Sequence, residues 1–169
     1  EKYGPLSLIQ VDAHTDTWAD DDMSRVDHGT MFYKAVKSGI VDPKTSVQIG
    51  IRTHNDDTLG VNIIDAREVY ESGPAAVAQK IKSILGDRPV YLSFDIDGLD
   101  PAFAPGTGTP VWGGLSSIQA QIIAGYQSNK LRVASDLDVC INVVGFSECI
   151  DVLDEVGSDD PLIATALQN

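Results

Sequence analysis

Two apolar segments of this chain each end in a short run of acidic residues. The first covers residues 6–12 and leads into "DAHTDT", and the second covers residues 90–94 and leads into "DIDGLD". Short, nearly continuous apolar runs are typical of strands that are buried on both faces of a parallel sheet. Parallel strands carry their ligands beyond their carboxyl ends, so both acidic runs fall where such a sheet would place a functional site.

Strand and helix signals alternate along the rest of the chain. Further strands are predicted over residues 46–52, 61–65 and 142–146, and helices over residues 30–37, 74–85 and 116–126. Ser116 and Gln119 have the spacing of a capping box, and we expect Ile118, Ile122 and Ile123 on the inner side of that helix. The pattern predicts an α/β fold with three α/β/α layers, a mostly parallel sheet and a single domain over residues 1–169.

The charged-residue composition of the chain limits the kinds of molecule that it is expected to bind. The 169 residues carry 12 Lys plus Arg against 25 Asp plus Glu, a net charge of −13, which argues against nucleic acid and favours a small cationic substrate. No 18-residue apolar stretch occurs, so no membrane span is expected. Cys140 and Cys149 lack the spacing of a disulfide framework or a C-x-x-C motif and favour a reducing, cytoplasmic location.

The acidic runs have the composition of a metal site. Side chains alternate between faces of an extended segment, so we expect Asp12, His14 and Asp16 to point the same way, and Asp95 and Asp97 likewise. Four carboxylates with one imidazole suit Mn²⁺ better than structural zinc. Their charge also balances two divalent ions better than one. Two such ions at about 3.5–4 Å can hold a water molecule and lower its pKa toward 7, which predicts metal-assisted hydrolysis.

Each of the two motifs also has a simpler interpretation. A single D-x-H-x-D or D-x-D motif commonly caps a helix or faces solvent, and only the two together favour a metal site. A calcium loop of the EF-hand type starting at Asp95 would need Gly at its sixth position and Glu at its twelfth. Asp100 and Gly106 stand there instead, which rules that loop out.

Two stretches resemble the ureohydrolase family, the binuclear manganese enzymes that include arginase and agmatinase. They are "VDAHTDT" and the continuous run "SFDIDGLDPAFAPGTGTPVWGG" over residues 93–114. Residues 27–53 resemble agmatinases more than arginases. The resemblance implies an arginase-like fold, two Mn²⁺ ions and hydrolysis of the guanidino group of agmatine to putrescine and urea. It also implies a homo-oligomer, a trimer or hexamer.

The same resemblance implies roles for individual residues. Asp12 and Asp95 would bridge both ions, Asp16 would complete the set of the first ion, and His14 with Asp97 would bind the second. His28 matches a histidine that shuttles protons near the substrate, whereas His54 matches no such role and is expected at the surface. The acidic loop over residues 18–26 is expected at the mouth of the site, where its carboxylates either attract a cationic substrate or, more commonly for such loops, face water.

The sequence departs from the family pattern in two places. The family's upstream Gly-Gly-Asp-His segment, whose histidine binds the first ion, has no counterpart before Glu1. We therefore expect an incomplete C-terminal portion that lacks the N-terminal segment. The family's late substrate glutamate is represented only by Glu148, which stands two residues before the matching position, Ile150.

These departures keep two alternatives open. One is another amidinohydrolase, such as a guanidinobutyrase or a proclavaminate amidinohydrolase. The other is a truncated, non-catalytic subunit of ureohydrolase type that still binds metal.

Overall fold

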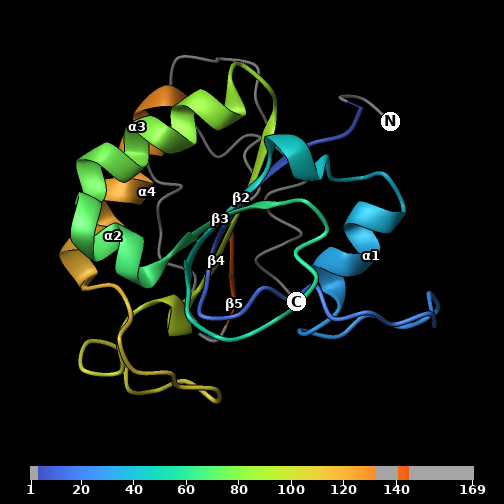
Figure 1. The fold of residues 1–169 in the computed structure, drawn as a ribbon, viewed down its shortest axis with the longest axis horizontal. Helices are drawn as coiled ribbons and strands as arrows, with labels where there is room; N and C mark the ends of the chain where they lie inside the picture. The colour runs from blue at the N-terminus through green and yellow to red at the C-terminus, as the bar shows by residue number, and fades with distance from the viewer. Residues whose placement is uncertain (1–3, 132–140, 145–169) are drawn as a thin grey trace, which may run out of the picture.

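The computed structural model describes residues 4–131 and 141–144 (Figure 1). The strands within these residues form one sheet in the order β3-β2-β1-β4-β5, in which all neighbours are parallel. The elements are, in chain order, β1 (Ser7–Val11), α1 (Met31–Lys37), η1 (Pro43–Thr45), β2 (Val47–Ile51), β3 (Asn62–Asp65), α2 (Ala66–Ser72), α3 (Pro74–Leu85), β4 (Val90–Asp95), η2 (Ile96–Gly98), α4 (Ser117–Leu131) and β5 (Ile141–Val144).

The strand order creates a switch point beside the central strand. From β1 the chain moves outward through β2 to β3, and then returns to the other side of β1 as β4. The connections that leave β1 and β4 therefore run in opposite directions across the sheet. In parallel α/β sheets this arrangement leaves a crevice beyond the strand ends, which is where ligands bind.

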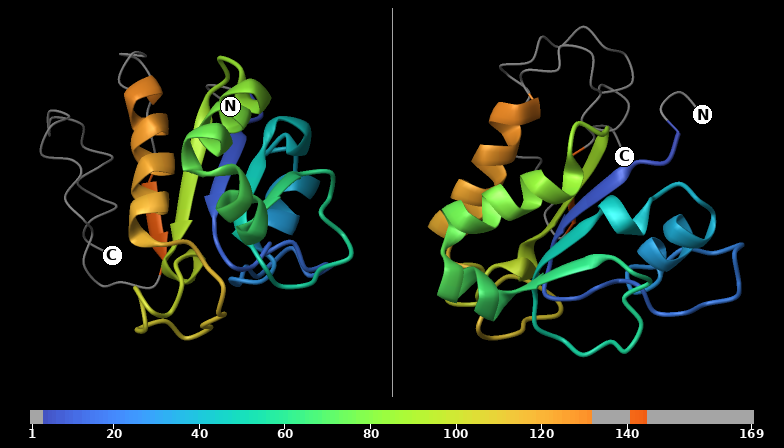
Figure 2. Two further views of the ribbon diagram at one scale, coloured as in Figure 1. Left: turned by 60° about the vertical axis from the view of Figure 1, so that its left-hand side comes forward. Right: turned by 45° about the horizontal axis from the view of Figure 1, so that its top comes forward.

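Helices cover both faces of the sheet, as the sequence predicts. Figure 1 and Figure 2 show α2, α3 and α4 on one side of the strands and α1 on the other. The larger apolar core lies on the side of α2, α3 and α4, where Val77, Ile81 and Ile123 pack against strand residues such as Ile49. A smaller cluster of Leu8, Phe32 and Val41 joins α1 to the sheet. The result is the three-layer α/β/α fold.

Local signals account for the ends of the helices. Pro74 occupies the first turn of α3, where the missing N–H is not needed, and Gly86 with φ 59° follows its last residue. The capping box at α4 is present: the Ser116 amide donates to Gln119 Oε1 at 2.9 Å, and the Gln119 amide donates to Ser116 Oγ at 3.3 Å.

The prediction of which residues of α4 face the core is only partly confirmed. Ile123 is buried, but Ile118 is 57% exposed and Ile122 is 38% exposed. The buried stripe instead includes Ala120, three residues before Ile123. Ile118 lies about 140° around the helix from Ile123, so both side chains cannot face the core.

Helix α2 was not predicted from the sequence. This helix begins directly after β3, with Asp65 as its cap: Asp65 Oδ1 accepts a 2.7 Å hydrogen bond from the Glu68 amide. Asp65 thus ends a strand and starts a helix with no intervening loop. A one-residue junction of this kind leaves no turn signal between the two elements in the sequence.

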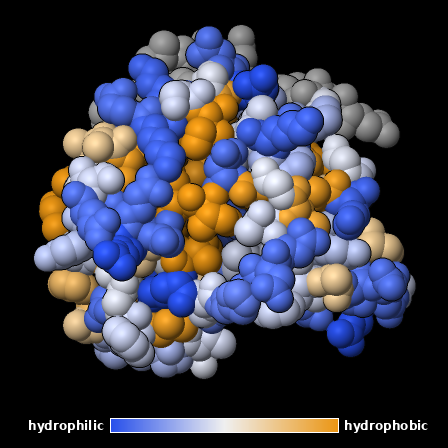
Figure 3. Space-filling view, in the orientation of Figure 1, coloured by the Kyte–Doolittle hydropathy of each residue, from blue (hydrophilic) through white to orange (hydrophobic). Residues whose placement is uncertain are grey.

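Apolar surface remains visible on one face of the described chain. Figure 3 shows it in the middle of that face, over the part of the sheet where β2 and β3 lie in Figure 1, with hydrophilic side chains around it. Within the described ranges, no helix combines the length and apolarity that a membrane crossing requires.

Candidate metal centre

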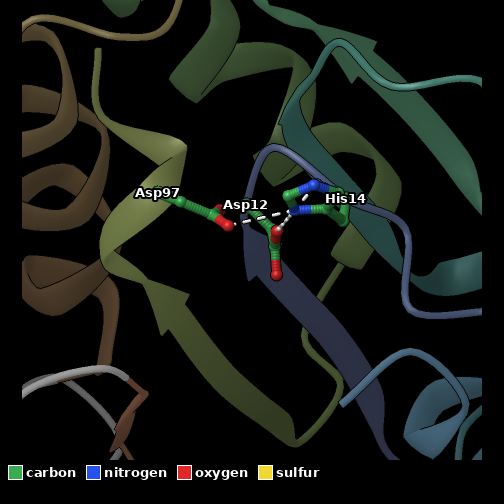
Figure 4. A group of neighbouring side chains, drawn as sticks. All are labelled: Asp12, His14 and Asp97. Carbon is green, nitrogen blue, oxygen red and sulfur yellow. Dashed lines mark hydrogen bonds and ion pairs between the residues drawn. The ribbon is translucent and has the colours of Figure 1, made fainter. Parts of the chain in front are cut away.

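Asp12, His14 and Asp97 meet at the switch point between β1 and β4. One ligand atom from each residue lies within 4.8 Å of the others. His14 Nδ1 is 3.0 Å from Asp97 Oδ2 and 3.4 Å from Asp12 Oδ1, so the imidazole nitrogen faces both carboxylates (Figure 4). Both acids are buried, whereas the His14 side chain is partly accessible. The group is therefore open to solvent on the histidine side.

The connection after β1 holds the Asp12 carboxylate close to the strand end. The Asp12 amide continues the sheet by donating to the Ile49 carbonyl at 3.0 Å. Its Oδ1 then accepts a 2.7 Å hydrogen bond from the His14 amide, which closes a tight turn. This turn brings the His14 ring back over the carboxylate.

Asp97 is fixed by contacts from two other segments. Its Oδ1 accepts a 3.0 Å hydrogen bond from the Ala13 amide, and its Oδ2 accepts a 2.8 Å hydrogen bond from Thr109 Oγ1. Next to it, a Cβ on Gly98 would lie 3.0 Å from the Asp12 amide nitrogen. Glycine at this position therefore allows the connections after β1 and β4 to approach each other closely.

Asp16 and Asp95 lie outside this three-residue group. β1 ends at Val11 and Asp16 has φ 53°, so residues 12, 14 and 16 do not continue one extended strand with a common face. The Asp16 carbonyl instead accepts hydrogen bonds from two amides in the first turn of α1, those of Phe32 and Tyr33. Asp95 is the last residue of β4, and its Oδ1 accepts from the Asp97 amide at 2.9 Å.

The acids and the imidazole nevertheless form one electrostatic unit. Burial, together with the charge of Asp12, raises the pKa of Asp16 to about 8. Burial raises the pKa of Asp95 to about 6. The hydrogen bond from the Asp97 amide opposes this shift in part, and the charge of Asp12 adds to it. Hydrogen bonding to Asp12 and then to Asp97 raises the pKa of His14 to about 10.

The pKa values of the two buried acids beside His14 are shifted in opposite directions. Burial raises the pKa of Asp12 above its usual range. Burial alone would also raise the pKa of Asp97, but hydrogen bonds from His14, the Ala13 amide and Thr109 hold it well below that range. Asp97 is thus the carboxylate that stays charged beside the imidazolium.

This donor set fits a divalent cation. Among the described residues, the only side chain that forms an ion pair with any of the four acids is His14. One imidazole cannot balance four crowded carboxylates, and a bound cation removes the cost of burying the remaining charge. Carboxylate oxygens with one imidazole nitrogen match the preference of Mn²⁺ and similar metals.

Arg52, which the sequence analysis passed over, braces the loop after β4. Its guanidinium donates to the backbone carbonyls of Gly50, Asp97, Gly98, Leu99 and Val111. It therefore binds main chain rather than the acids of the centre. The sequence signal for this role was a single arginine that directly follows the apolar end of a strand.

Asp100 and Gly114 complete the support of the same loop. Asp100 Oδ2 accepts from the Gly113 amide at 2.7 Å and from the Gly114 amide at 3.0 Å. A Cβ on Gly114 would lie 2.6 Å from the Asp100 amide nitrogen and 2.7 Å from Arg52 Nη2, so only glycine fits. These contacts hold the segment that carries Thr109 toward Asp97.

The acidic loop between Asp16 and α1 is organised by a buried lysine. Lys34 Nζ donates to Asp20 Oδ2 at 2.8 Å, to the Asp22 carbonyl at 2.6 Å and to the Arg25 carbonyl. The Lys34 side chain is only 6% exposed. The Asp20 carboxylate is thus engaged in an internal contact, whereas the sequence predicts that it attracts substrate or faces water.

The three other residues discussed from the sequence, His28, His54 and Glu148, are not part of the three-residue group among the described residues. His28 is exposed near the base of the acidic loop, where the Trp18 amide donates to the Gly29 carbonyl at 3.0 Å, and it is not in the three-residue group. The His54 side chain is 87% exposed, as expected. Glu148 lies outside the described residues.

Comparison with known proteins places this site in a family. The model of the arginase family matches residues 1–155. The chain belongs to the arginase family. The resemblance inferred from "VDAHTDT" and residues 93–114 is thereby confirmed.

Relatives of this arginase-family chain include proteins named agmatinase. The agmatinase of Chromobacterium violaceum is 51% identical over 168 residues, which cover 99% of this chain and 48% of the relative. The agmatinase of Neisseria meningitidis serogroup C is 49% identical over 165 residues, which again cover 48% of the relative. The chain thus spans about half the length of the curated relatives it matches.

Solved structures of the family share the fold. A hypothetical agmatinase from Burkholderia thailandensis superposes with a TM-score of 0.75 and 58% identity over 85% of this chain and 44% of that one. The proclavaminate amidino hydrolase of Streptomyces clavuligerus gives a TM-score of 0.71 and 41% identity over 84% of this chain and 47% of that one. The predicted arginase-like fold is therefore confirmed.

Proposed function

We propose that this chain carries the metal centre of a binuclear manganese hydrolase that converts agmatine and water into putrescine and urea. The observation that carries the proposal is the group of Asp12, His14 and Asp97 at the switch point, with the Asp16 and Asp95 carboxylates near enough to feel its charges. Identity of about 50% to proteins named agmatinase supports agmatine as the substrate.

The ligand assignment follows the resemblance to the ureohydrolase family. His14 and Asp97, which face each other at 3.0 Å, are assigned to one ion. Asp16 would hold the other ion, and Asp12, which follows β1, and Asp95, which ends β4, would contribute to both ligand sets. When bound, the two ions supply the Lewis acidity that activates water for attack on the guanidinium carbon.

The protein's own residues contribute binding and proton transfer. The net charge of −13 attracts a dicationic substrate, and the loop ordered by Lys34 carries acidic side chains beside the first turn of α1. Breaking the bond between carbon and the alkyl nitrogen requires a proton on that nitrogen. We assign the transfer to His28, whose exposed position at the loop base gives it access to water, and contact with the guanidinium to Glu148.

Urea release from three guanidines tests the substrate. Agmatine, guanidinobutyrate and arginine are supplied separately to the manganese-loaded protein, and agmatine is expected to react fastest. Turnover of guanidinobutyrate or another guanidine with agmatine inert would favour a guanidinobutyrase or a proclavaminate amidinohydrolase-like enzyme. This second class has support from the solved proclavaminate amidino hydrolase at 41% identity.

Metal content separates an enzyme from a binding subunit. About two manganese ions per chain together with urea release supports catalysis, whereas one ion or none without turnover identifies a non-catalytic subunit. Sedimentation velocity on the same samples tests the proposed homo-oligomer, for which a trimer or hexamer is expected.

A further inference from the structure

Two buried glutamines link β2 to the Asp12 carboxylate. Gln10 and Gln48 are paired directly across β1 and β2, and both are fully buried. Gln48 Nε2 donates to Gln10 Oε1 at 2.6 Å, and Gln10 Nε2 donates to Asp12 Oδ2 at 2.8 Å. A continuous line of side-chain amides therefore runs through the sheet to the candidate metal centre.

The two ends of this line fix the direction of every hydrogen bond in it. At one end, Gln48 Nε2 also donates to the Thr15 carbonyl at 2.5 Å. At the other, Gln10 Nε2 donates to the His14 carbonyl at 3.3 Å as well as to Asp12. Carbonyl and ionised carboxylate oxygens only accept, so each amide group must turn its nitrogen toward them. Turning either amide by 180° would place oxygen against oxygen.

The unused atom of Gln48 indicates what the amide is for. Gln48 Oε1 is buried and has no hydrogen-bond partner among the described residues. A buried acceptor without a partner is unfavourable. An amide at this position is therefore explained by its two donor hydrogens rather than by full satisfaction of its own polar atoms.

We propose that Gln10 and Gln48 are positioning residues of the metal centre, which act as a relay that holds the Asp12 carboxylate in one orientation. Oδ2 is turned toward Gln10, and Oδ1 is turned toward the His14 amide at 2.7 Å. Each carboxylate oxygen accepts more than one bond, so both oxygens keep a lone pair for a cation. The inference deepens the proposed function and rests on it for the identity of the bound ion.

The relay acts in series, and this property distinguishes it from ordinary packing. Without the donor on Gln48, Gln10 Oε1 loses its hydrogen bond, and the Gln10 side chain loses the contact with β2 that holds it against Asp12. Without the donor on Gln10, Gln48 has no connection to Asp12. Loss of either residue should therefore have a similar effect on the centre, and loss of both should add little more.

The test measures Mn²⁺ affinity by calorimetry on the whole chain after EDTA treatment. Gln10→Met and Gln48→Met keep the side-chain length and remove the donors. Each is expected to weaken Mn²⁺ binding by about 10-fold to 100-fold, the range found for residues that orient metal ligands. The double variant is expected to lie within about threefold of Gln10→Met, because the relay is serial.

Ser7→Ala is the matched control. Ser7 lies at the other end of β1, is fully buried and donates to Thr45 Oγ1 at 2.9 Å. Its removal also deletes a buried hydrogen bond from the same strand, but it should leave the Mn²⁺ affinity unchanged. Equal losses in the control and the relay variants would show a general effect of destabilising β1 and overturn the proposal.

Two other results would overturn it. Affinities of the glutamine variants close to that of the unmodified chain would exclude the relay while leaving the proposed function intact. Absence of Mn²⁺ binding by the unmodified chain would contradict both the relay and the proposed function. If a variant does not fold, NMR of the unmodified chain decides: the side-chain amide protons of Gln10 and Gln48 should exchange slowly in single sets of signals, and rapid exchange would contradict a fixed orientation.

Discussion

His14 Nδ1 lies 3.0 Å from Asp97 Oδ2, across the switch point between β1 and β4. The two residues are separated by most of the described chain, and the parallel order β1-β4 brings them together. The Ala13 amide and Thr109 hold Asp97 in place from either side. The metal site proposed for this chain depends on that relationship, because neither acidic run forms a ligand set alone.

Asp97→Asn should weaken Mn²⁺ binding by at least about tenfold, since it removes the most strongly ionised carboxylate of the group while keeping its shape. Equilibrium dialysis with manganese measures the effect. Asp56→Asn is the control: it changes the same charge at a side chain that is 93% exposed. Equal affinities for the two variants would remove Asp97 from the ligand set.

The metal-free protein should lose stability as the pH rises from about 4 to 10. Asp16 has a folded pKa of about 8, Asp95 one of about 6 and His14 one of about 10, all above their ordinary values of 3.8, 3.8 and 6.5. A raised folded pKa stabilises the fold below the unfolded value, and that stability is lost as the pH passes the folded value. Asp97 has the opposite shift, so its contribution is lost only as the pH falls below its ordinary range.

Thermal unfolding in EDTA at pH 5.5 and pH 8.5 checks this dependence, and the lower Tm is expected at pH 8.5. Added Mn²⁺ should raise the Tm more at pH 8.5 than at pH 5.5, because the ion competes with protons for the same atoms. A metal-free Tm that rises between these pH values would contradict the proposed crowding of acids.

Arg52→Lys should destabilise the fold by about 2 kcal/mol or more, because an ammonium cannot reach the several carbonyls that the planar guanidinium holds together. Urea unfolding measures the change. Arg67→Lys provides the comparison, since Arg67 forms an exposed pair with Glu71 on one helix, and it should leave the stability almost unchanged. Similar results for both variants would show that Arg52 does not brace the loop.

Gly114→Ala should be destabilising by about 1–3 kcal/mol, because the added methyl group would overlap the backbone at Asp100 and Leu99. Gly106→Ala lies in the same connection, where a Cβ meets nothing within 4 Å, and should be close to neutral. Chemical unfolding of the two variants side by side gives the difference. A neutral Gly114→Ala would mean that the loop relaxes without cost.

Much of the fold could be predicted because its signals are local. Fully buried strands such as β1 and β2 appear as apolar runs, and Pro74 and Gly86 bracket α3. The start of α2 at Asp65 was missed because one residue serves both a strand and a helix. The inner face of α4 was misjudged at Ile118 because three isoleucines cannot all share one side of that helix.

The site was predictable in its residue types but less so in its geometry. Asp12, His14 and Asp97 are visible as motifs at strand ends, whereas the turn that takes Asp16 to φ 53° is not. Gln10 and Arg52 were passed over because their roles depend on partners far away in the sequence. Hydrogen bonds between distant segments leave no periodicity or spacing to recognise.

Calorimetric titration of the EDTA-treated chain with Mn²⁺ at pH 8 tests the central claim most directly. The proposed centre predicts saturable binding accompanied by proton release, since His14 and Asp16 must give up protons that their raised pKa values retain. Heat of dilution alone, with no saturable binding and no proton release, would contradict a metal site at the switch point.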